Sequence, residues 1–322
     1  MARRSVLADW FPDGSHESFL HDDFGKRVAH VSGNRERFAD LLTAEEFLRN
    51  AHACARSDSD TFRFGGRSLR DDQAQYSRLF LEAARNRTVW SSLDELASDC
   101  ASGLTLIFNQ LYHFNKKVDG LSKRMLHEFG EFTGANAYFS PASGKLGLGW
   151  HYDCWDVFVL QIAGAKRWYY SEDGNILPVE RMDFGAPEPE IEHETIEEVL
   201  LEQGALLYLP RGTWHRPITV DEHSLHLTVG IHRRAHLHFN SWIFHELSQN
   251  PDLRAFLPLD PFGSPTSGKL DEELAGALGA YSDEVARLLT GPGALSRYRI
   301  FCLQSANKRM NDGRPELSED EP

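Results

Sequence analysis

Six short runs with β propensity follow one another between residues 103 and 232, and most of them are bounded by Gly, Pro or Asn. The runs are GLTLIF (103–108), ANAYFS (135–140), WDVFVLQIAG (155–164), KRWYYS (166–171), GALLYLP (204–210) and HSLHLTVGI (223–231). Many short strands with alternating faces are typical of a β-barrel or a sandwich. The sequence therefore predicts a mainly β core over residues 101–232.

The part of the chain before this core has helical signals. Thr43 and Glu46 have the spacing of a capping box ahead of the run FLRNAHACA, and Ser92 and Glu95 form a second such pair. In a capping box the two side chains satisfy free N–H groups at the start of a helix. We therefore expect residues 1–100 to form a mostly helical part that packs on the core.

The part of the chain after residue 232 is also helical in pattern. The stretches AHLHFNSWIFHELSQ and LDEELAGALGAYSDEVARLLTG have apolar residues at helical spacing. The final stretch, NDGRPELSEDEP, is acidic and poor in apolar residues. We expect a helical C-terminal region over residues 233–308 and a disordered acidic tail over residues 309–322.

The composition indicates a folded protein without a membrane span. A chain of 322 residues with 41% hydrophobic content has enough apolar surface for one large domain and a smaller one. No apolar run reaches the roughly 18 residues of a membrane span, and none near the start has signal-peptide length. The cysteines, Cys54, Cys100, Cys154 and Cys302, form no C-x-x-C pair, which argues against a disulfide framework or a zinc knuckle. A cytoplasmic location is expected.

The charge is negative and unevenly distributed. The 34 Lys and Arg residues against 48 Asp and Glu residues give a net charge of −14, and residues 171–202 carry eleven acids and one base. Nucleic acid is not expected as a direct ligand, because phosphate binding needs clustered Lys and Arg. The acidic stretch fits a cationic partner, or else a solvated loop that keeps the protein soluble.

The stretch GWHYDCWD brings two potential metal ligands together. Residues i and i+2 of a strand point to the same face, so His151 and Asp153 are expected side by side on one strand. His215 follows some sixty residues later, after a strand and a Pro-Arg-Gly turn. Two histidines and one carboxylate can occupy one face of an octahedral Fe(II) and leave three positions open. The alternative is a set of satisfied polar residues in the core.

Lys166 is a candidate for holding an anionic ligand beside this metal. It begins the run KRWYYS, directly after a turn expected at Gly164, so its ammonium is expected in the mouth of the barrel. A buried lysine needs a paired anion, and the distal carboxylate of 2-oxoglutarate would supply it. The alternative is an exposed lysine at a strand edge, beside Arg167.

Two further strands have one polar and one apolar face. Asn136 and Tyr138 share a face of ANAYFS, while Ser224, His226 and Thr228 share a face of HSLHLTV. One polar face per strand is what a ligand-lined barrel interior requires. The alternative is that these faces point outward into solvent.

The run from GANAYFS to KRWYY and the run LYLPRGTWHRPITVDEHSLHLTVGI resemble the JmjC-type cupins, most of all their ribosomal-oxygenase branch. The resemblance covers roughly residues 20–240 and rests on the linked motifs N-x-Y, H-x-D, L-Q-x-x-G-x-K-x-W, L-P-x-G-x-x-H and H-S-L-x-L. It implies a double-stranded β-helix (jelly-roll) core with a helical N-terminal arm and a helical C-terminal region. Two features do not match: the region after residue 232 is short for that branch, and residues 171–202 have no counterpart that we can match.

The resemblance also implies the cofactors and the roles of residues. The iron ligands would be His151, Asp153 and His215, and Lys166 would bind the carboxylate of 2-oxoglutarate. The cosubstrate pocket would be lined by Asn136, Tyr138 and Ser224. The implied activity uses Fe(II), 2-oxoglutarate and O2 to hydroxylate a side chain of a protein or peptide, and the family's habit of dimerising implies a homodimer.

Other functions stay open at this point. The same chemistry serves hydroxylases of a small metabolite or of a peptide natural-product precursor, which a short C-terminal region would suit, and it serves N-methyl demethylases. A catalytically silent cupin that only binds a partner is an alternative of another class. The complete ligand set argues against it, because such a module has no physical need for three ligands and the lysine.

Overall fold

The computed structural model describes residues 5–11, 14–56, 62–65, 90–99, 105–141, 148–172, 177–179, 195–257 and 268–312. The chain divides into two compact units, of which the first is Met1–Arg233 with Lys308–Pro322 and the second is Arg234–Asn307. Most of the acidic stretch, and residues 313–322 of the acidic tail expected from the sequence, lie outside the described residues.

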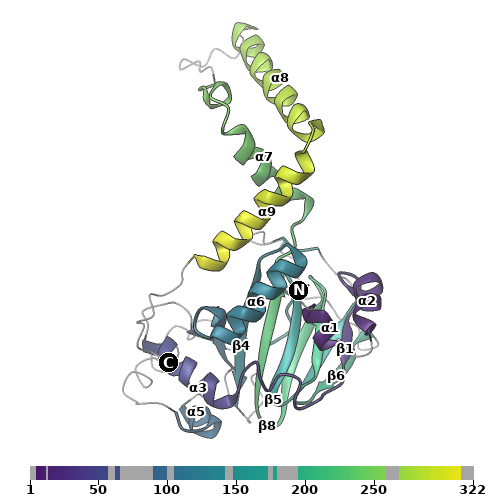
Figure 1. The fold of residues 1–322 in the computed structure, drawn as a ribbon, viewed down its shortest axis with the longest axis vertical. Coiled ribbons are helices and arrows are strands. Elements are labelled where there is room, and N and C mark those ends of the chain that lie inside the picture. Colours follow the sequence, from purple (N-terminus) through teal and green to yellow (C-terminus); the bar gives the residue numbers. More distant parts are fainter. Residues whose placement is uncertain are drawn as a thin grey trace. The chain divides into compact units, whose positions relative to one another are not determined.

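The first unit is built on an antiparallel sheet of eight strands (Figure 1). The strands are β1 (Ala29–Val31), β2 (Phe62–Gly65), β3 (Thr105–Phe108), β4 (Thr133–Ser140), β5 (Asp156–Ser171), β6 (Glu197–Leu201), β7 (Leu206–Leu209) and β8 (Trp214–Ile231). Their order is β1-β7-β5-β8-β4-β3-β2, and β6 pairs with β5 outside this path. Strands β1, β2 and β6 were not predicted from the sequence, because their residues AHV, FRFG and EEVLL form no continuous apolar run like those of the equally short β3 and β7.

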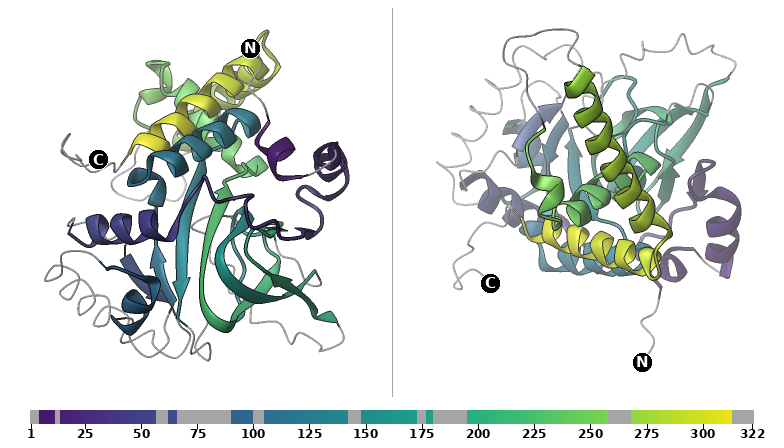
Figure 2. Two further views of the ribbon diagram at one scale, coloured as in Figure 1. Left: turned by 60° about the horizontal axis from the view of Figure 1, so that its bottom comes forward. Right: turned by 90° about the horizontal axis from the view of Figure 1, so that it is seen from above.

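The two longest strands, β5 and β8, pair along their whole lengths and curve strongly, as the left view of Figure 2 shows. The ladder is irregular between Gln161 and Ala165. Gly164 has a φ of 63° there, and a Cβ on it would lie 2.1 Å from the carbonyl oxygen of His223. The prediction of two strands joined by a turn at Gly164 is therefore wrong: this is one strand with a bulge, which bends the sheet.

The other edge of β5 divides at this bend. Its first half pairs with β7 and its second half pairs with β6. Because β5 takes part in two sheet regions that run in different directions, the sheet curves into a jelly-roll core. This architecture confirms the mainly β fold class expected from the sequence. Residues that are far apart in β5 can therefore face the same enclosed space.

Helices surround the sheet of the first unit. They are α1 (Val6–Trp10), α2 (Ser15–Ser18), the π-helix η2 (Phe19–Asp23), α3 (Ala44–Arg56), α5 (Leu93–Asp99), the 3-10 helix η5 (Leu111–His113) and α6 (Lys116–Phe129). Helix α3 covers the sheet where the ring of Phe47 packs 5.1 Å from that of Phe108 and 6.1 Å from that of Phe139. All three rings are fully buried.

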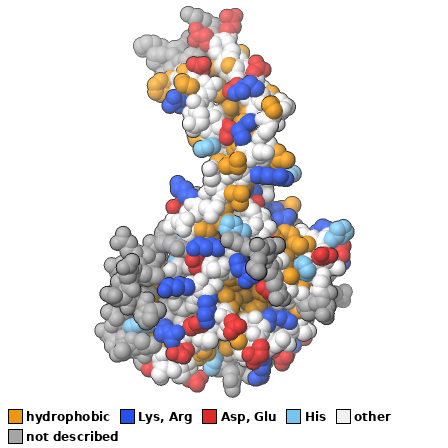
Figure 3. Space-filling view, viewed as in Figure 1, with side chains coloured by type: hydrophobic (Ala, Val, Ile, Leu, Met, Phe, Trp, Pro, Cys, Tyr) orange, Lys and Arg blue, Asp and Glu red, His pale blue; other side chains and the backbone are white. Residues whose placement is uncertain are grey.

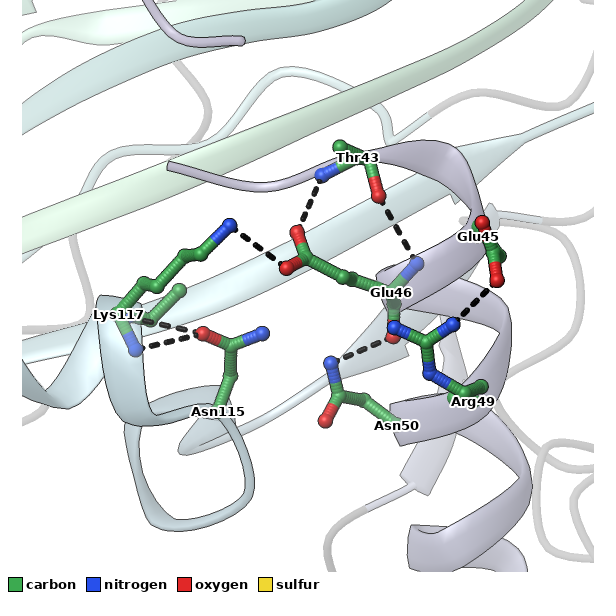
Figure 4. A network of polar contacts seen from close by, with 8 residues as sticks. Thr43, Glu45, Glu46, Arg49, Asn50, Asn115 and Lys117 are labelled. Atoms are coloured by element: carbon green, nitrogen blue, oxygen red, sulfur yellow. Dashed lines mark hydrogen bonds and ion pairs between the residues drawn. The ribbon is translucent and has the colours of Figure 1, made fainter. Parts of the chain in front are cut away.

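Helices α3 and α6 are joined by a polar network (Figure 4). The capping box predicted at the start of α3 is present, because Thr43 Oγ1 accepts from the N–H of Glu46 at 3.1 Å and the Glu46 carboxylate accepts from the N–H of Thr43 at 2.9 Å. The same carboxylate lies 2.7 Å from Lys117 Nζ in α6. Asn115 Oδ1 caps α6 by accepting from the N–H groups of Lys117 and Val118, both at 3.0 Å.

The second predicted box, before α5, forms with one change. Ser92 Oγ accepts from the N–H of Glu95 at 3.1 Å as expected. The Glu95 carboxylate, however, accepts from the N–H of Ser91 at 2.7 Å. The helix start is therefore capped as the sequence predicts, with the reciprocal bond shifted by one residue.

The second unit is helical and consists of η7 (His236–His238), α7 (Phe239–Leu247), η8 (Asp252–Arg254), α8 (Gly268–Thr290) and most of α9 (Ala294–Asn311). A small core of Trp242, Leu247 and Leu288 holds it together. Helix α9 lies mostly within the region expected to be helical, residues 233–308, and continues three residues beyond it, although its own stretch was not singled out. In the described part of the chain no helix combines the length and the apolar character needed to cross a bilayer.

Candidate metal centre

His151 and His215 lie next to each other because their backbones form an isolated antiparallel bridge. The N–H of His151 donates to the carbonyl of His215 at 3.1 Å, and the reverse bond is 2.8 Å long. Their ring centroids are 4.2 Å apart. His215 belongs to β8, but His151 precedes β5, so the prediction that a strand carries the H-x-D pair is wrong.

His151 and Asp153 are positioned by the loop before β5 and not, as expected, by a strand. Residues 148–155 form no strand beyond the single bridge at His151, and the regular ladder starts at Asp156. The carbonyl of Asp153 accepts from the N–H of Gly212 at 2.9 Å, which fixes the loop against the turn before β8. Asp153 and His215 thereby approach from two segments tied by their backbones.

Each imidazole is oriented by a carbonyl two residues before it. The Nδ1 atom of His151 is 2.7 Å from the carbonyl of Gly149, and the Nδ1 atom of His215 is 2.9 Å from the carbonyl of Thr213. A carbonyl can only accept, so the Nδ1 atoms carry the protons and the Nε2 atoms keep lone pairs. Metal-binding histidines usually donate their other ring N–H to a carbonyl or carboxylate in this way.

Asp153 completes a group of three potential ligands. Its Oδ2 lies 3.7 Å from His215 Nε2, and one ligand atom from each of His151, Asp153 and His215 lies within 4.8 Å of the others. Burial, followed by the neighbouring His151, lowers the pKa of His215 to about 4, so this imidazole is neutral at physiological pH. In the described part of the chain no other such cluster of His, Cys, Asp and Glu occurs.

These three side chains open into a cavity between β4, β5 and β8. Its lining consists of Tyr138, Leu148, His151, Asp153, Val157, Val159, Trp168, His215, Pro217, His226 and Thr228. Val157, Val159 and Trp168 are also part of a buried apolar cluster. The cavity thus has the ligand cluster on one side and a largely apolar wall on another, which is typical of a small-molecule site.

Lys166 is buried behind this cavity. Its side chain is 2% exposed, and its Nζ lies 3.3 Å from Nδ1 of His226, which lines the cavity. Its partners in the strand ladders are the uncharged Leu201 and Thr219. Among the described residues no carboxylate forms an ion pair with it, and burial lowers its pKa to about 7. An anion in this place would relieve the cost of burying the ammonium.

The other predicted pocket residues separate into two groups. Tyr138 lines the cavity, and its ring stacks on that of His226 with a centroid distance of 4.8 Å and an interplanar angle of 2°. Asn136 shares the face of Tyr138, but its Oδ1 accepts from the N–H of Gln110 at 2.8 Å. Ser224 is fully buried, and its Oγ accepts from Nε2 of Gln161 at 2.8 Å. Neither Asn136 nor Ser224 lines the cavity.

Among the cavity residues that were not predicted as site residues, His226 and Trp168 carry ring N–H groups. His226 shares one face of β8 with Ser224 and Thr228, and Trp168 shares one face of β5 with Lys166, because each is two residues away from these neighbours. The period of two was therefore the signal that could have identified both. It was not decisive, because alternation alone does not tell a cavity wall from a packed core.

Comparisons with known proteins give a consistent picture. Residues 108–238 match the family model of the JmjC domain. Ribosomal oxygenase 2 of Rattus norvegicus is 30% identical over 231 residues, which cover 65% of this chain and 48% of that protein. Ribosomal oxygenase 1 of Danio rerio is 32% identical over 237 residues, which cover 70% of this chain and 39% of that protein. The chain thus spans about half or less of the length of these relatives.

A solved structure has the same fold. The ribosomal oxygenase YcfD of Escherichia coli, in complex with cobalt and 2-oxoglutarate, is 18% identical and superposes with a TM-score of 0.52, over 87% of this chain and 68% of that one. At this identity the likeness supports the fold alone. Residues 108–238 are therefore a JmjC domain, and the chain belongs to the ribosomal-oxygenase branch of the JmjC proteins.

Proposed function

We propose that the protein is an Fe(II)- and 2-oxoglutarate-dependent oxygenase that uses O2 to hydroxylate a side chain of a protein or peptide. The observation that carries this proposal is the cluster of His151, Asp153 and His215 at a cavity backed by the buried Lys166, which pairs with no carboxylate of the described residues. The three-residue cluster is suited to bind a metal ion and Lys166 is suited to bind an anion, so one site could hold both ligands.

The donor set fits Fe(II). Two imidazoles whose Nδ1 atoms face backbone carbonyls and one carboxylate form the 2-His-1-carboxylate set of non-haem iron oxygenases, which leaves open positions for further ligands. The hydrogen bonds from Nδ1 of His151 and His215 to backbone carbonyls hold both rings for this task. Asp153 would add the negative charge, and its side chain is 45% exposed.

The anion site fits 2-oxoglutarate. Lys166 is the cation available to its distal carboxylate, while the keto-acid end would reach the metal. When bound, iron and 2-oxoglutarate supply the oxidation of a C–H bond by O2. The protein's own part is to orient both groups, and the apolar wall formed by Val157, Val159 and Trp168 excludes water from the reaction.

A protein substrate is the class that the relatives' names support. One relative of Dictyostelium discoideum, 40% identical over 119 residues that cover 36% of this chain, is named bifunctional lysine-specific demethylase and histidyl-hydroxylase NO66. The described ends of the acidic stretch present exposed carboxylates on Glu172, Glu197 and Glu198. We therefore propose a cationic protein segment as the substrate, with no direct binding of nucleic acid. The cytoplasmic location stays a prediction from the sequence.

A homodimer is proposed for the helical unit. Several large apolar side chains of this unit are exposed, and orange patches on it are visible in Figure 3. Phe244 is 76% exposed, Leu278 is 69% exposed and Leu295 is 62% exposed. Burying such residues against a second copy would stabilise an association. Light scattering of the intact chain tests this part of the proposal separately from the chemistry.

The cofactor chemistry is tested without a substrate. Fe(II) and then 2-oxoglutarate are added to the purified protein in the absence of O2, and the visible metal-to-ligand charge-transfer band is recorded. The band is expected for the natural chain and for Asp94→Ala, which changes an exposed aspartate of α5. It should be absent for Asp153→Ala. Iron binding by the natural chain without this band would refute the proposed use of 2-oxoglutarate.

A further inference from the structure

The ring of His226 is held in one orientation at the wall of the cavity. Tyr138 stacks on one side at 4.8 Å, and Trp168 meets the ring edge-on at 5.5 Å with an angle of 78°. On a third side, Nδ1 of His226 is 3.3 Å from Lys166 Nζ. His226 is 2% exposed, so these contacts leave its imidazole no freedom to turn.

This orientation decides where the proton of the imidazole lies. Burial, followed by the charge of Lys166, keeps the pKa of His226 well below its usual value, so the ring is neutral. An ammonium has only donors, so Nδ1 of His226 must accept from Lys166 and the proton must sit on Nε2. No hydrogen bond joins this Nε2–H to any residue that the structure describes.

A second donor at the cavity is also unpaired. Trp168 lines the cavity, and its buried Nε1–H has no hydrogen-bond partner among the described residues. Lys166 is not among the residues that line the cavity, but its Nζ contacts Nδ1 of His226, which does line it. The wall near Lys166 therefore presents N–H groups that need an acceptor, and a buried unpaired donor costs free energy.

We infer that His226 is a direct ligand-positioning residue: its Nε2–H donates to the distal carboxylate of the cosubstrate, while its Nδ1 accepts from Lys166 and transmits that residue's charge to the pocket. This inference rests on the proposed use of 2-oxoglutarate. It assigns Lys166 and His226 to one unit, in which the lysine fixes the tautomer of the histidine. Trp168 Nε1–H is the adjacent donor to the same carboxylate.

The test compares two oxo acids on the Mn(II)-loaded protein by isothermal titration calorimetry. The probes are 2-oxoglutarate and 2-oxobutyrate, which has the keto-acid end but no distal carboxylate. The variant His226→Phe keeps an aromatic ring and removes both nitrogens. We expect it to weaken 2-oxoglutarate binding about 10- to 100-fold, the effect of losing a hydrogen bond to a charged group, and to leave 2-oxobutyrate and Mn(II) binding unchanged.

The matched control is His223→Phe, on the same strand but with its Nδ1 3.3 Å from the exposed Asp94. It should bind both oxo acids like the natural chain. His226→Gln retains a donor and should recover part of the affinity for 2-oxoglutarate. If His226→Phe does not fold, His226→Gln is compared with His226→Leu, and the same difference is expected.

The outcomes separate the inference from the proposed function. If the natural chain binds 2-oxoglutarate and His226→Phe binds it equally well, the role of His226 is wrong and the proposed function stands. Equal losses for both oxo acids would also refute the inference, because they would indicate general damage to the pocket. If the natural chain shows no preference for 2-oxoglutarate over 2-oxobutyrate, the proposed function itself fails.

Discussion

His151 and His215 are joined by two backbone hydrogen bonds of 3.1 and 2.8 Å, so the main chain holds their imidazoles side by side. Each ring is then turned by its own Nδ1 contact to a carbonyl. The two imidazoles are therefore organised by the protein, and Asp153, with its half-exposed side chain, is the more accessible to solvent of the Asp153 and His215 pair. Pre-organised ligands lower the entropic cost of binding a metal.

Substitution of Asp153 by alanine should remove both metal affinity and turnover. The change deletes the carboxylate of the cluster. Loss of a group that only orients a metal ligand commonly costs 10- to 100-fold in affinity, so we expect a loss of about 100-fold or more. Mn(II) titration followed by electron paramagnetic resonance measures the affinity, and succinate release measures turnover. Asp94→Ala should leave both unchanged, and succinate release at the natural rate by Asp153→Ala would refute the ligand assignment.

Substitution of Lys166 by methionine should raise the amount of 2-oxoglutarate needed for half-maximal succinate release. Methionine fills a similar volume and cannot supply charge, so the carboxylate loses its cation while the metal ligands stay in place. We expect an increase of about 10- to 100-fold. Lys123→Met, in an exposed pair with Asp119, is the matched control. An unaltered requirement in Lys166→Met would remove the proposed role of this residue.

The same variant should reveal the cost of burying the ammonium. Burial lowers the pKa of Lys166 from 10.5 to about 7. Between these two values the unfolded chain binds a proton that the folded chain has released, so the contribution of this group to stability rises with pH by up to about 1.4 kcal/mol per unit. Below pH 7 both states are protonated and the cost is constant.

The measurement is urea unfolding of the metal-free natural chain and of Lys166→Met across this pH range. The variant should be the more stable at pH 7, because it buries no charge. Its advantage should shrink as the pH rises toward 10.5, where the natural lysine is neutral in both states. A stability difference that does not change with pH would show that Lys166 keeps an ordinary pKa in the folded protein.

Much of the fold followed from local patterns in the sequence. The runs that became β3, β4, β5, β7 and β8 were identifiable from β propensity and flanking turn residues. The short strands β1 (AHV), β2 (FRFG) and β6 (EEVLL) were not, because they include polar or charged residues and lack the unbroken apolar run of the equally short β3 (TLIF) and β7 (LLYL). Gly164 was read as a turn because a glycine between two strand-like runs fits a turn and a bulge equally well.

The residues of the metal site could be predicted from the sequence, but the backbone structure that supports them could not. His151, Asp153 and His215 were found from their chemical types and order, and the structure brings them together. Their support is a bridge between a loop and a strand, and this depends on long-range contacts that no local pattern encodes. Asn136 and Ser224 share polar strand faces as predicted, but neighbouring groups bind their side chains, and this too was invisible in the sequence.

Substitution of Tyr208 by phenylalanine should lower the free energy of unfolding. The Tyr208 hydroxyl donates to the buried Asp156 carboxylate at 2.7 Å and accepts from the N–H of Gly25 at 2.7 Å. Burial raises the pKa of Tyr208, so this hydroxyl stays protonated and able to donate. Its removal leaves a buried carboxylate with fewer donors, for an expected loss of about 1–3 kcal/mol in urea unfolding.

The control for this prediction is Tyr281→Phe in α8. Tyr281 is 48% exposed, so removal of its hydroxyl should change stability by less than about 0.5 kcal/mol. Arg233 Nη1 lies 3.3 Å from the other oxygen of Asp156, and this contact is kept in Tyr208→Phe. If Tyr208→Phe is as stable as the natural chain, the hydrogen bond to Asp156 is not maintained in solution.

Substitution of Gly164 by alanine tests whether the bulge in β5 is needed to build the pocket. A Cβ at this position would lie 2.1 Å from the carbonyl oxygen of His223, and the φ of 63° is unfavourable for alanine. We expect a loss of more than about 2 kcal/mol in urea unfolding, together with weaker 2-oxoglutarate binding, because Lys166 follows the bulge by two residues. Gly120→Ala in α6 has open space around its Cβ and should instead stabilise the protein by about 0.5–1 kcal/mol. If both substitutions stabilise the chain, β5 runs straight at Gly164 and the placement of Lys166 behind the cavity is wrong.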